Sequence, residues 1–174
     1  MAASGVQSLL TGPSAVSPVA AIRVDVGSCQ KRTMTQNLAM IALLVDDYDN
    51  ALSFYVGKLG FEKTEDKRLS AMKRWVTVVP PGGASGLLLA RAADDRQREA
   101  IGNQSGGRVF LFLHTDDFEG DHAKYVRRGV RFVEQPRNET YGKVAIFEDP
   151  YGNRWDLIEP RPREMEGNGR FLAK

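Results

Sequence analysis

Cysteine and histidine are scarce in this sequence. Of its 174 residues, one is cysteine (Cys29) and two are histidine (His114 and His122). A single cysteine has no partner for an intrachain disulfide, which favours a reducing compartment, and we predict the cytoplasm. The chain has no paired cysteines, no HExxH, no GxSxG and no glycine-rich phosphate loop. It therefore lacks the usual signatures of a nucleophile-dependent hydrolase or a nucleotide-binding enzyme.

Long apolar runs and an excess of one charge are also missing. No stretch approaches the roughly 20 apolar residues that cross a membrane, so we expect no membrane partner. Residues 1–33 hold three of the 24 basic residues and one of the 22 acidic residues, which leaves 21 of each sign in the remainder. A balanced chain offers no broad basic surface, and we expect no nucleic acid partner.

The most informative feature present is an internal repeat. LLVDDYDNALSFYVGKLGF returns as LHTDDFEGDHAKYVRRGVRF, and Asp46-Asp47 and Asp116-Asp117 are 70 residues apart. A domain made of two similar halves tends to have its working site between them.

Each half has the pattern strand, helix, three strands. In the first half, a buried strand (38–45) is followed by carboxylates that can cap a helix, a helix that ends at Gly60, and three short runs separated by turns. The second half repeats this order from residue 109 to residue 159. We predict a leader or disordered extension (1–36), one domain (37–160) and a polar tail (161–174). Within the domain, the modules are 37–91 and 107–160, with a linking helix in 92–106.

With VDDYDNALSFYVGKLGF opening one half and FEDPYGNRWDLIEP closing the other, the chain resembles the vicinal oxygen chelate superfamily of glyoxalase I, extradiol dioxygenases and bleomycin-resistance proteins. The resemblance implies an α+β fold in which two βαβββ modules form curled sheets around a cavity. It also implies a homodimer, because cavities in this superfamily are often completed by a partner chain. The fold alone does not choose an activity, since this superfamily includes both metal enzymes and metal-free binders.

The superfamily's usual metal positions are mostly apolar here. Carried across to this sequence, they fall on Met40, Leu89, Phe110 and Asp156. Only Asp156 offers a donor suited to a divalent cation, which needs several oxygen or nitrogen ligands. We therefore predict no metal and no other cofactor.

Strand periodicity predicts what lines the cavity instead. Because alternate residues of a strand share a face, Met40 points into the cavity with Ala42, and Phe110, Phe112 and His114 do so in the second module. Leu89 and Trp75 add apolar contact, and Arg137 and Tyr141 lie in a loop that should border the cavity mouth. An apolar, aromatic cavity suits an organic ligand better than an ion.

Asp156 and His114 are the candidate catalytic residues. A carboxylate in the middle of a strand is costly to bury unless something pairs with it, and imidazole titrates near neutral pH. Asp156 could instead pair with an arginine such as Arg154, Arg74 or Arg137, and His114 could be a satisfied strand-end histidine.

We predict a protein that binds a small organic molecule without a metal, as bleomycin-resistance proteins do. The alternative is a glyoxalase-like lyase or isomerase, or a ring-cleaving dioxygenase, whose displaced divalent metal would use His114 and Asp156. Further donors would then come from Glu134, Glu148 or Glu159. A third reading is metal-free acid–base catalysis by His114 and Asp156.

Overall fold

A computed structural model describes residues 36–161. Residue contacts divide the chain into a first unit, Met1–Gln36, and a second unit, Asn37–Lys174. All but the last residue of the predicted leader, including Cys29, and all but the first residue of the predicted polar tail lie outside the described residues. The description below concerns the second unit.

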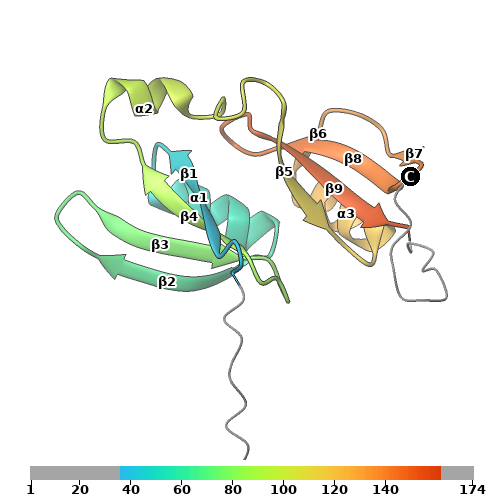
Figure 1. Ribbon diagram of the computed structural model, residues 1–174, viewed down its shortest axis with the longest axis horizontal. Helices are drawn as coiled ribbons and strands as arrows, with labels where there is room; N and C mark the ends of the chain where they lie inside the picture. The colour runs from blue at the N-terminus through green and yellow to red at the C-terminus, as the bar shows by residue number, and fades with distance from the viewer. Residues whose placement is uncertain (1–35, 162–174) are drawn as a thin grey trace, which may run out of the picture. The chain divides into compact units, whose positions relative to one another are not determined.

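The first module forms a four-stranded sheet with its helix on one face (Figure 1). Its elements are β1 (Met40–Val45), α1 (Tyr48–Leu52), a π-helical segment (Ser53–Lys58), β2 (Glu62–Arg68), β3 (Arg74–Val79) and β4 (Gly86–Arg91). The strand order is β1-β4-β3-β2; β1 pairs with β4 in parallel and the other pairs are antiparallel. The helix between β1 and β2 is what allows the first and last strands to run parallel.

The second module repeats this topology and adds a strand. Its elements are β5 (Val109–His114), α3 (Phe118–Arg127), β6 (Arg131–Phe132), β7 (Arg137–Glu139), β8 (Gly142–Glu148) and β9 (Arg154–Pro160). The order is β5-β9-β8-β6, with β7 also paired to β8, so this sheet has five strands. The predicted α+β fold of two βαβββ modules is confirmed.

The repeat has a physical basis at the helix starts. Asp47 caps α1, its carboxylate accepting from the amides of Asp49 and Asn50, each at 2.9 Å. Asp117, 70 positions later, caps α3 by accepting from the amide of Gly120 at 3.0 Å. Both aspartates satisfy amides that have no partner within the helix, which is why the same residue stands at both places.

One hydrophobic core joins the helix-bearing faces of the two modules. Tyr55 lies in this core with its ring centroid 6.0 Å from that of Trp155, which stacks on Phe147 at 5.8 Å. The Tyr55 hydroxyl donates to Oδ2 of Asp149 at 2.7 Å. The modules are thus held together by an aromatic cluster and by a buried hydrogen bond between residues 94 positions apart.

The linking segment contributes α2 (Asp95–Ala100), as predicted, and a side chain that closes the outer edge of β1. Gln104 accepts from the Leu44 amide at 2.8 Å and donates to the Ala42 carbonyl at 3.2 Å. Its amide group thereby replaces the neighbouring strand that an edge strand lacks.

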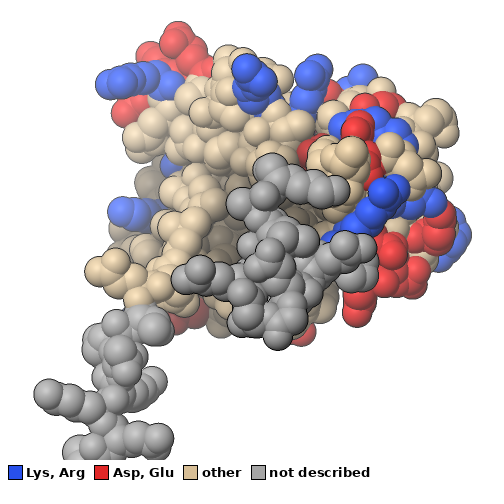
Figure 2. Space-filling view, turned by 45° about the vertical axis from the view of Figure 1, so that its right-hand side comes forward, with Lys and Arg blue, Asp and Glu red and all other residues tan. Residues whose placement is uncertain are grey.

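Two features were not predicted. The first helix changes to π-helical geometry at Ser53, where the Leu59 amide donates to the Phe54 carbonyl five residues earlier at 3.0 Å. The loop that we predicted around Arg137 and Tyr141 contains β7. In the described part of the chain, no helix has the length and apolar character to span a membrane. On the face shown in Figure 2, basic and acidic side chains are interspersed.

Candidate functional site

Each sheet has one face in the core and one face without a helix, which we call the helix-free face. The core contains Leu43 and Val45 of β1, together with Trp155 and Leu157 of β9. Because successive side chains alternate, the residues between them lie on the helix-free face. The predicted site residues can be placed by this criterion.

On the first sheet, Met40 and Trp75 lie on the helix-free face, and Leu89 does not. Met40 is 40% exposed. Trp75 precedes the core residue Val76 and shares its face with Thr77, which pairs with Leu88. Leu89 pairs with Leu43 and Val76 in the core and is fully buried, so its predicted position in the cavity is wrong by one residue. Leu88, equally apolar, takes that place.

On the second sheet, the helix-free face carries Phe112, His114 and Asp156. Phe112 pairs with Asp156, which pairs in turn with Ile146, so the three lie side by side across three strands. Phe112 is 62% exposed. His114 is two residues further along β5 and also exposed, opposite Ile158.

Phe110 differs from its prediction. The β5–β9 register shifts between Val109 and Leu111, so Phe110 is skipped in the pairing and packs against the core. A strand irregularity of this kind breaks the alternation on which the prediction depended. Val144 and Ile146 of β8 also lie on the helix-free face, and we did not predict them as site residues. The alternation of apolar residues along β8 could have identified them.

Asp156 is the unusual group of this face. It is 5% exposed, and its Oδ1 has no hydrogen-bond partner among the described residues. Burial raises the pKa of this carboxyl group above its ordinary value, and the positive charge of Arg137 opposes that shift without cancelling it. Asp156 is therefore a buried carboxylate whose desolvation is only partly offset by the positive charge of Arg137.

Arg137 and Tyr141 belong to the β7–β8 hairpin. Arg137 pairs with Val144, which places it on the same face as Asp156. Its guanidinium is in ion-pair contact with Glu134 and Glu139, although Nη1 lacks the geometry of a hydrogen bond. Tyr141, 50% exposed, lies in the turn between these strands.

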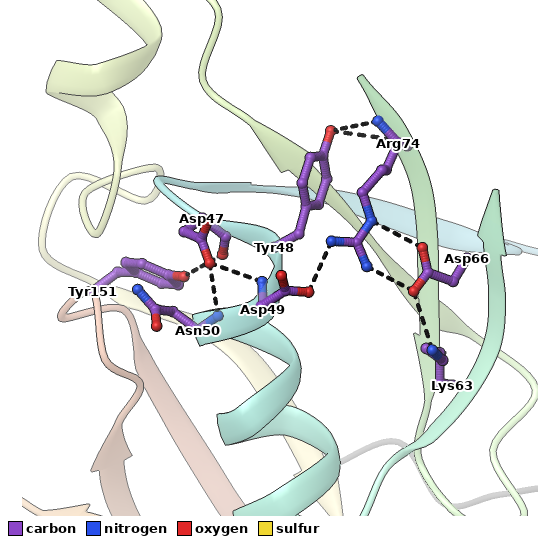
Figure 3. A network of polar contacts seen from close by, with 8 residues as sticks. All are labelled: Asp47, Tyr48, Asp49, Asn50, Lys63, Asp66, Arg74 and Tyr151. Atoms are coloured by element: carbon purple, nitrogen blue, oxygen red, sulfur yellow. Dashed lines mark hydrogen bonds and ion pairs between the residues drawn. The ribbon is translucent and has the colours of Figure 1, made fainter. Parts of the chain in front are cut away.

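Arg74, the residue before Trp75, lies in a polar network on the other face of the strand (Figure 3). Arg74 binds Asp66 of β2 through two nitrogens, at 2.9 and 2.7 Å, and Asp49 of α1 at 2.8 Å. The Tyr48 hydroxyl donates to the Arg74 carbonyl and accepts from its amide. Hydrogen bonds from Arg74 and Lys63 lower the pKa of Asp66 to about 2. These contacts fix the start of β3, and with it the residue that follows.

Few of the superfamily's metal-ligand positions carry a donor side chain in this chain. The positions carried across from the superfamily's ligands are Met40, Leu89, Phe110 and Asp156, of which one is an oxygen donor. Within residues 36–161, no group of three or more His, Cys, Asp or Glu side chains is arranged to hold an ion.

Two adjoining surface cavities, of about 480 and 370 Å³, lie elsewhere. Both are lined by Phe54 and Lys58 of the π-helical segment and by Pro150 and Tyr151 of the β8–β9 turn. Glu148, named above as a possible further metal donor, lines the first of them, and none of the predicted catalytic or ligand-binding residues lines either cavity.

Comparison with known proteins gives a consistent result. The sequence model of the Glyoxalase/Bleomycin resistance protein/Dioxygenase superfamily matches residues 37–157. An uncharacterized protein of Shewanella frigidimarina is 54% identical over 129 residues, which cover 72% of this chain and 95% of that protein.

Two solved structures are similar in both fold and sequence. TnmS3, an antibiotic binding protein from Streptomyces sp. CB03234, is 30% identical with a TM-score of 0.60, covering 73% of this chain and 98% of TnmS3. UcmS2 is 27% identical with a TM-score of 0.63, covering 72% of this chain and 99% of UcmS2.

Proposed function

Because the chain belongs to the Glyoxalase/Bleomycin resistance protein/Dioxygenase superfamily, we propose that it binds a small organic molecule on the helix-free faces of its sheets without using a metal ion. The ligand has an apolar or aromatic body that contacts Met40, Trp75 and Phe112. Binding withholds the molecule from solution and leaves it chemically unchanged.

The observation that carries this proposal is the exposure of large apolar side chains beside a buried carboxylate. Phe112 is 62% exposed and pairs across the strands with Asp156, which is 5% exposed. A side chain such as Phe112 gains about 2 kcal/mol when it is fully removed from water. A ligand that covers it therefore has a driving force that a metal ion would not have.

The similarity to TnmS3 supports the same function. That protein is an antibiotic binding protein, and its sequence is 30% identical to this chain. The residues on the helix-free faces are of the types that line small-molecule pockets, mostly apolar with a few polar groups.

We propose further that the working form is a cytoplasmic homodimer. Exposed apolar residues on both sheets, with Met40 on the first and Phe112 on the second, form surfaces that a second copy would cover. Light scattering with size-exclusion chromatography tests this, and a monomer at micromolar concentration would contradict it.

A screen by thermal shift tests ligand binding directly. A molecule that prefers the folded state must raise the unfolding temperature. We expect aromatic drugs to do so in the wild type and to lose the effect in Phe112→Ala. Val126→Ala is the matched control, because Val126 is an exposed apolar residue on α3, away from the helix-free faces. An equal response of both variants would count against the site.

One observation favours an enzyme as the second candidate. His114 and Asp156 lie on the same helix-free face, on the neighbouring strands β5 and β9. They could exchange a proton with a substrate, or serve a displaced metal with further carboxylates. Elemental analysis of protein purified without chelator, and turnover of catechols and glutathione adducts, separate the candidates: stoichiometric metal, or turnover lost in Asp156→Asn, would establish the enzyme.

A further inference from the structure

The carboxylate of Asp156, on the second sheet, is buried without a full set of partners, and it indicates the chemical class of the ligand. Asp156 is buried, and its Oδ1 has no hydrogen-bond partner among residues 36–161. A buried polar atom without a partner destabilises the folded protein, because it gives up its hydrogen bonds to water and gains none in return. This desolvation penalty is larger for a charged group. A ligand group that reaches Oδ1 recovers that loss.

The nearby cation is already engaged. Arg137 is in ion-pair contact with both Glu134 and Glu139, which face it from the preceding loop and from its own strand. The set formed by Asp156, Arg137, Glu134 and Glu139 thus has three carboxylates and one cation. An anionic ligand group would be repelled here, whereas a cation would balance the charge that remains on Asp156.

The apolar neighbours define the rest of the ligand. Phe112 and Ile146 flank Asp156 on the two adjacent strands, and Ile158 is two residues along β9. Phe112 presents a large exposed aromatic surface. A cationic nitrogen joined to an aromatic body through one methylene carbon would place its N–H groups at the carboxylate while the rings cover Phe112.

The geometry points to Asp156 as a specificity-determining residue that selects ligands carrying a protonated amine on an aromatic body. This inference depends on the proposed binding function and names the ligand class of that same site. Replacing a carboxylate that serves only a ligand has a recognisable effect on stability. Its substitution removes the desolvation penalty of a buried group that lacks a partner, so the folded protein should become no less stable.

The test uses four probes of matched size: 2-naphthylmethylamine, 2-naphthylmethanol, 2-ethylnaphthalene and 2-naphthoate. Equilibrium dialysis at pH 7 measures the affinity of each for the full chain. We expect the amine to bind at least about tenfold more tightly than the alcohol, since a hydrogen bond to a charged group contributes more than a neutral one. We expect the naphthoate to bind most weakly.

Two variants separate a ligand role from a structural role. Asp156→Asn and Asp156→Leu should each lose at least about tenfold in amine affinity and keep the affinity for 2-ethylnaphthalene. Their urea midpoints should equal or exceed that of the wild type. Asp116→Asn, an exposed aspartate outside the sheets, is the control and should change neither quantity.

The outcomes distinguish this inference from the proposed function. If no naphthalene probe binds to the wild type, the proposed function is wrong. If the probes bind and the amine has no advantage over the alcohol, or keeps its advantage in Asp156→Leu, the proposed function stands and the role of Asp156 in selecting amines is refuted. A large loss of stability in both Asp156 variants would mark the residue as structural and also refute it.

Discussion

The buried hydrogen bond between Tyr55 and Asp149, one of several that connect the two modules, provides the sharpest test of how the fold is held together. Asp149 is 5% exposed, and its carboxylate accepts four hydrogen bonds. Three of them come from its own turn, from the amides of Tyr151 and Asn153 and from the side chain of Asn153. The fourth comes from Tyr55 of the other module at 2.7 Å. We therefore choose Tyr55→Phe as the perturbation.

The expected loss follows from the partners that remain. Phenylalanine keeps the ring, so no cavity forms and the contact with Trp155 persists. A hydrogen bond to a charged group contributes about 1.5–3 kcal/mol, and Oδ2 of Asp149 keeps its bond from Asn153, so we expect a loss of about 2 kcal/mol. With a urea dependence of about 2 kcal/mol per molar, the unfolding midpoint should fall by about 1 M with no change in slope.

The control is Tyr141→Phe, which removes a hydroxyl from a residue that is 50% exposed. It should change the free energy of unfolding by less than about 0.5 kcal/mol. A Tyr55→Phe midpoint within error of the wild type would refute the view that this bond holds the modules together.

The same pair predicts a dependence on alkaline pH. Burial, followed by the charge of Asp149, raises the pKa of Tyr55 well above its ordinary value of 10.0. The unfolded chain therefore releases this proton first. The stabilisation is complete below pH 10 and is lost as the pH rises from 10 toward the pKa of the folded state. Tyr55→Phe should flatten this part of the stability profile, and an unchanged alkaline slope would contradict the assignment.

Three further predictions concern other parts of the second unit. Gly102→Ala should destabilise by about 2 kcal/mol more than Gly82→Ala, because both glycines have positive φ, 77° and 69°, but only at Gly102 would a Cβ overlap a main-chain oxygen of the β8–β9 turn; equal losses in urea would contradict this. Arg74→Met should raise the pKa of Asp66 from about 2 toward its ordinary 3.8, followed by carbon-detected NMR titration, and an unmoved midpoint would refute the role of Arg74. Asp117→Ala should cost about 1 kcal/mol of unfolding free energy by removing the cap of α3, whereas no loss would mean that the cap is dispensable.

The arrangement of elements was predictable because the strongest sequence signals coincide with strong local physics. Capping aspartates at 47 and 117 mark two helix starts, and Gly60 and Gly129, with φ of 80° and 72°, allow the chain to turn after each helix. Both signals act within a few residues and do not depend on the rest of the fold. The sequence of elements along the chain followed from the repeat, whereas the order of strands within each sheet was not predicted.

The errors lie where a single position decides the outcome. Leu89 was assigned by similarity between motifs, and a displacement of one residue moves a side chain to the opposite face of a strand. Phe110 was assigned by alternation, which the register shift between Val109 and Leu111 interrupts. The contacts of Arg137 with Glu134 and Glu139 depend on β7, whose three residues carry no apolar pattern.

The helix-bearing faces of both sheets share one core, and this separation of the two faces affects how the sequence can evolve. Along β1 and β4, Leu43 and Leu89 maintain the fold, while Met40 and Leu88 lie on the opposite side of the sheet. Under the proposed function, substitutions at the second set would alter ligand recognition with little effect on the free energy of folding. A lineage built on this scaffold would then acquire new ligands by point mutation, whereas a one-residue insertion within a strand would exchange the two sets and disrupt both folding and the proposed site.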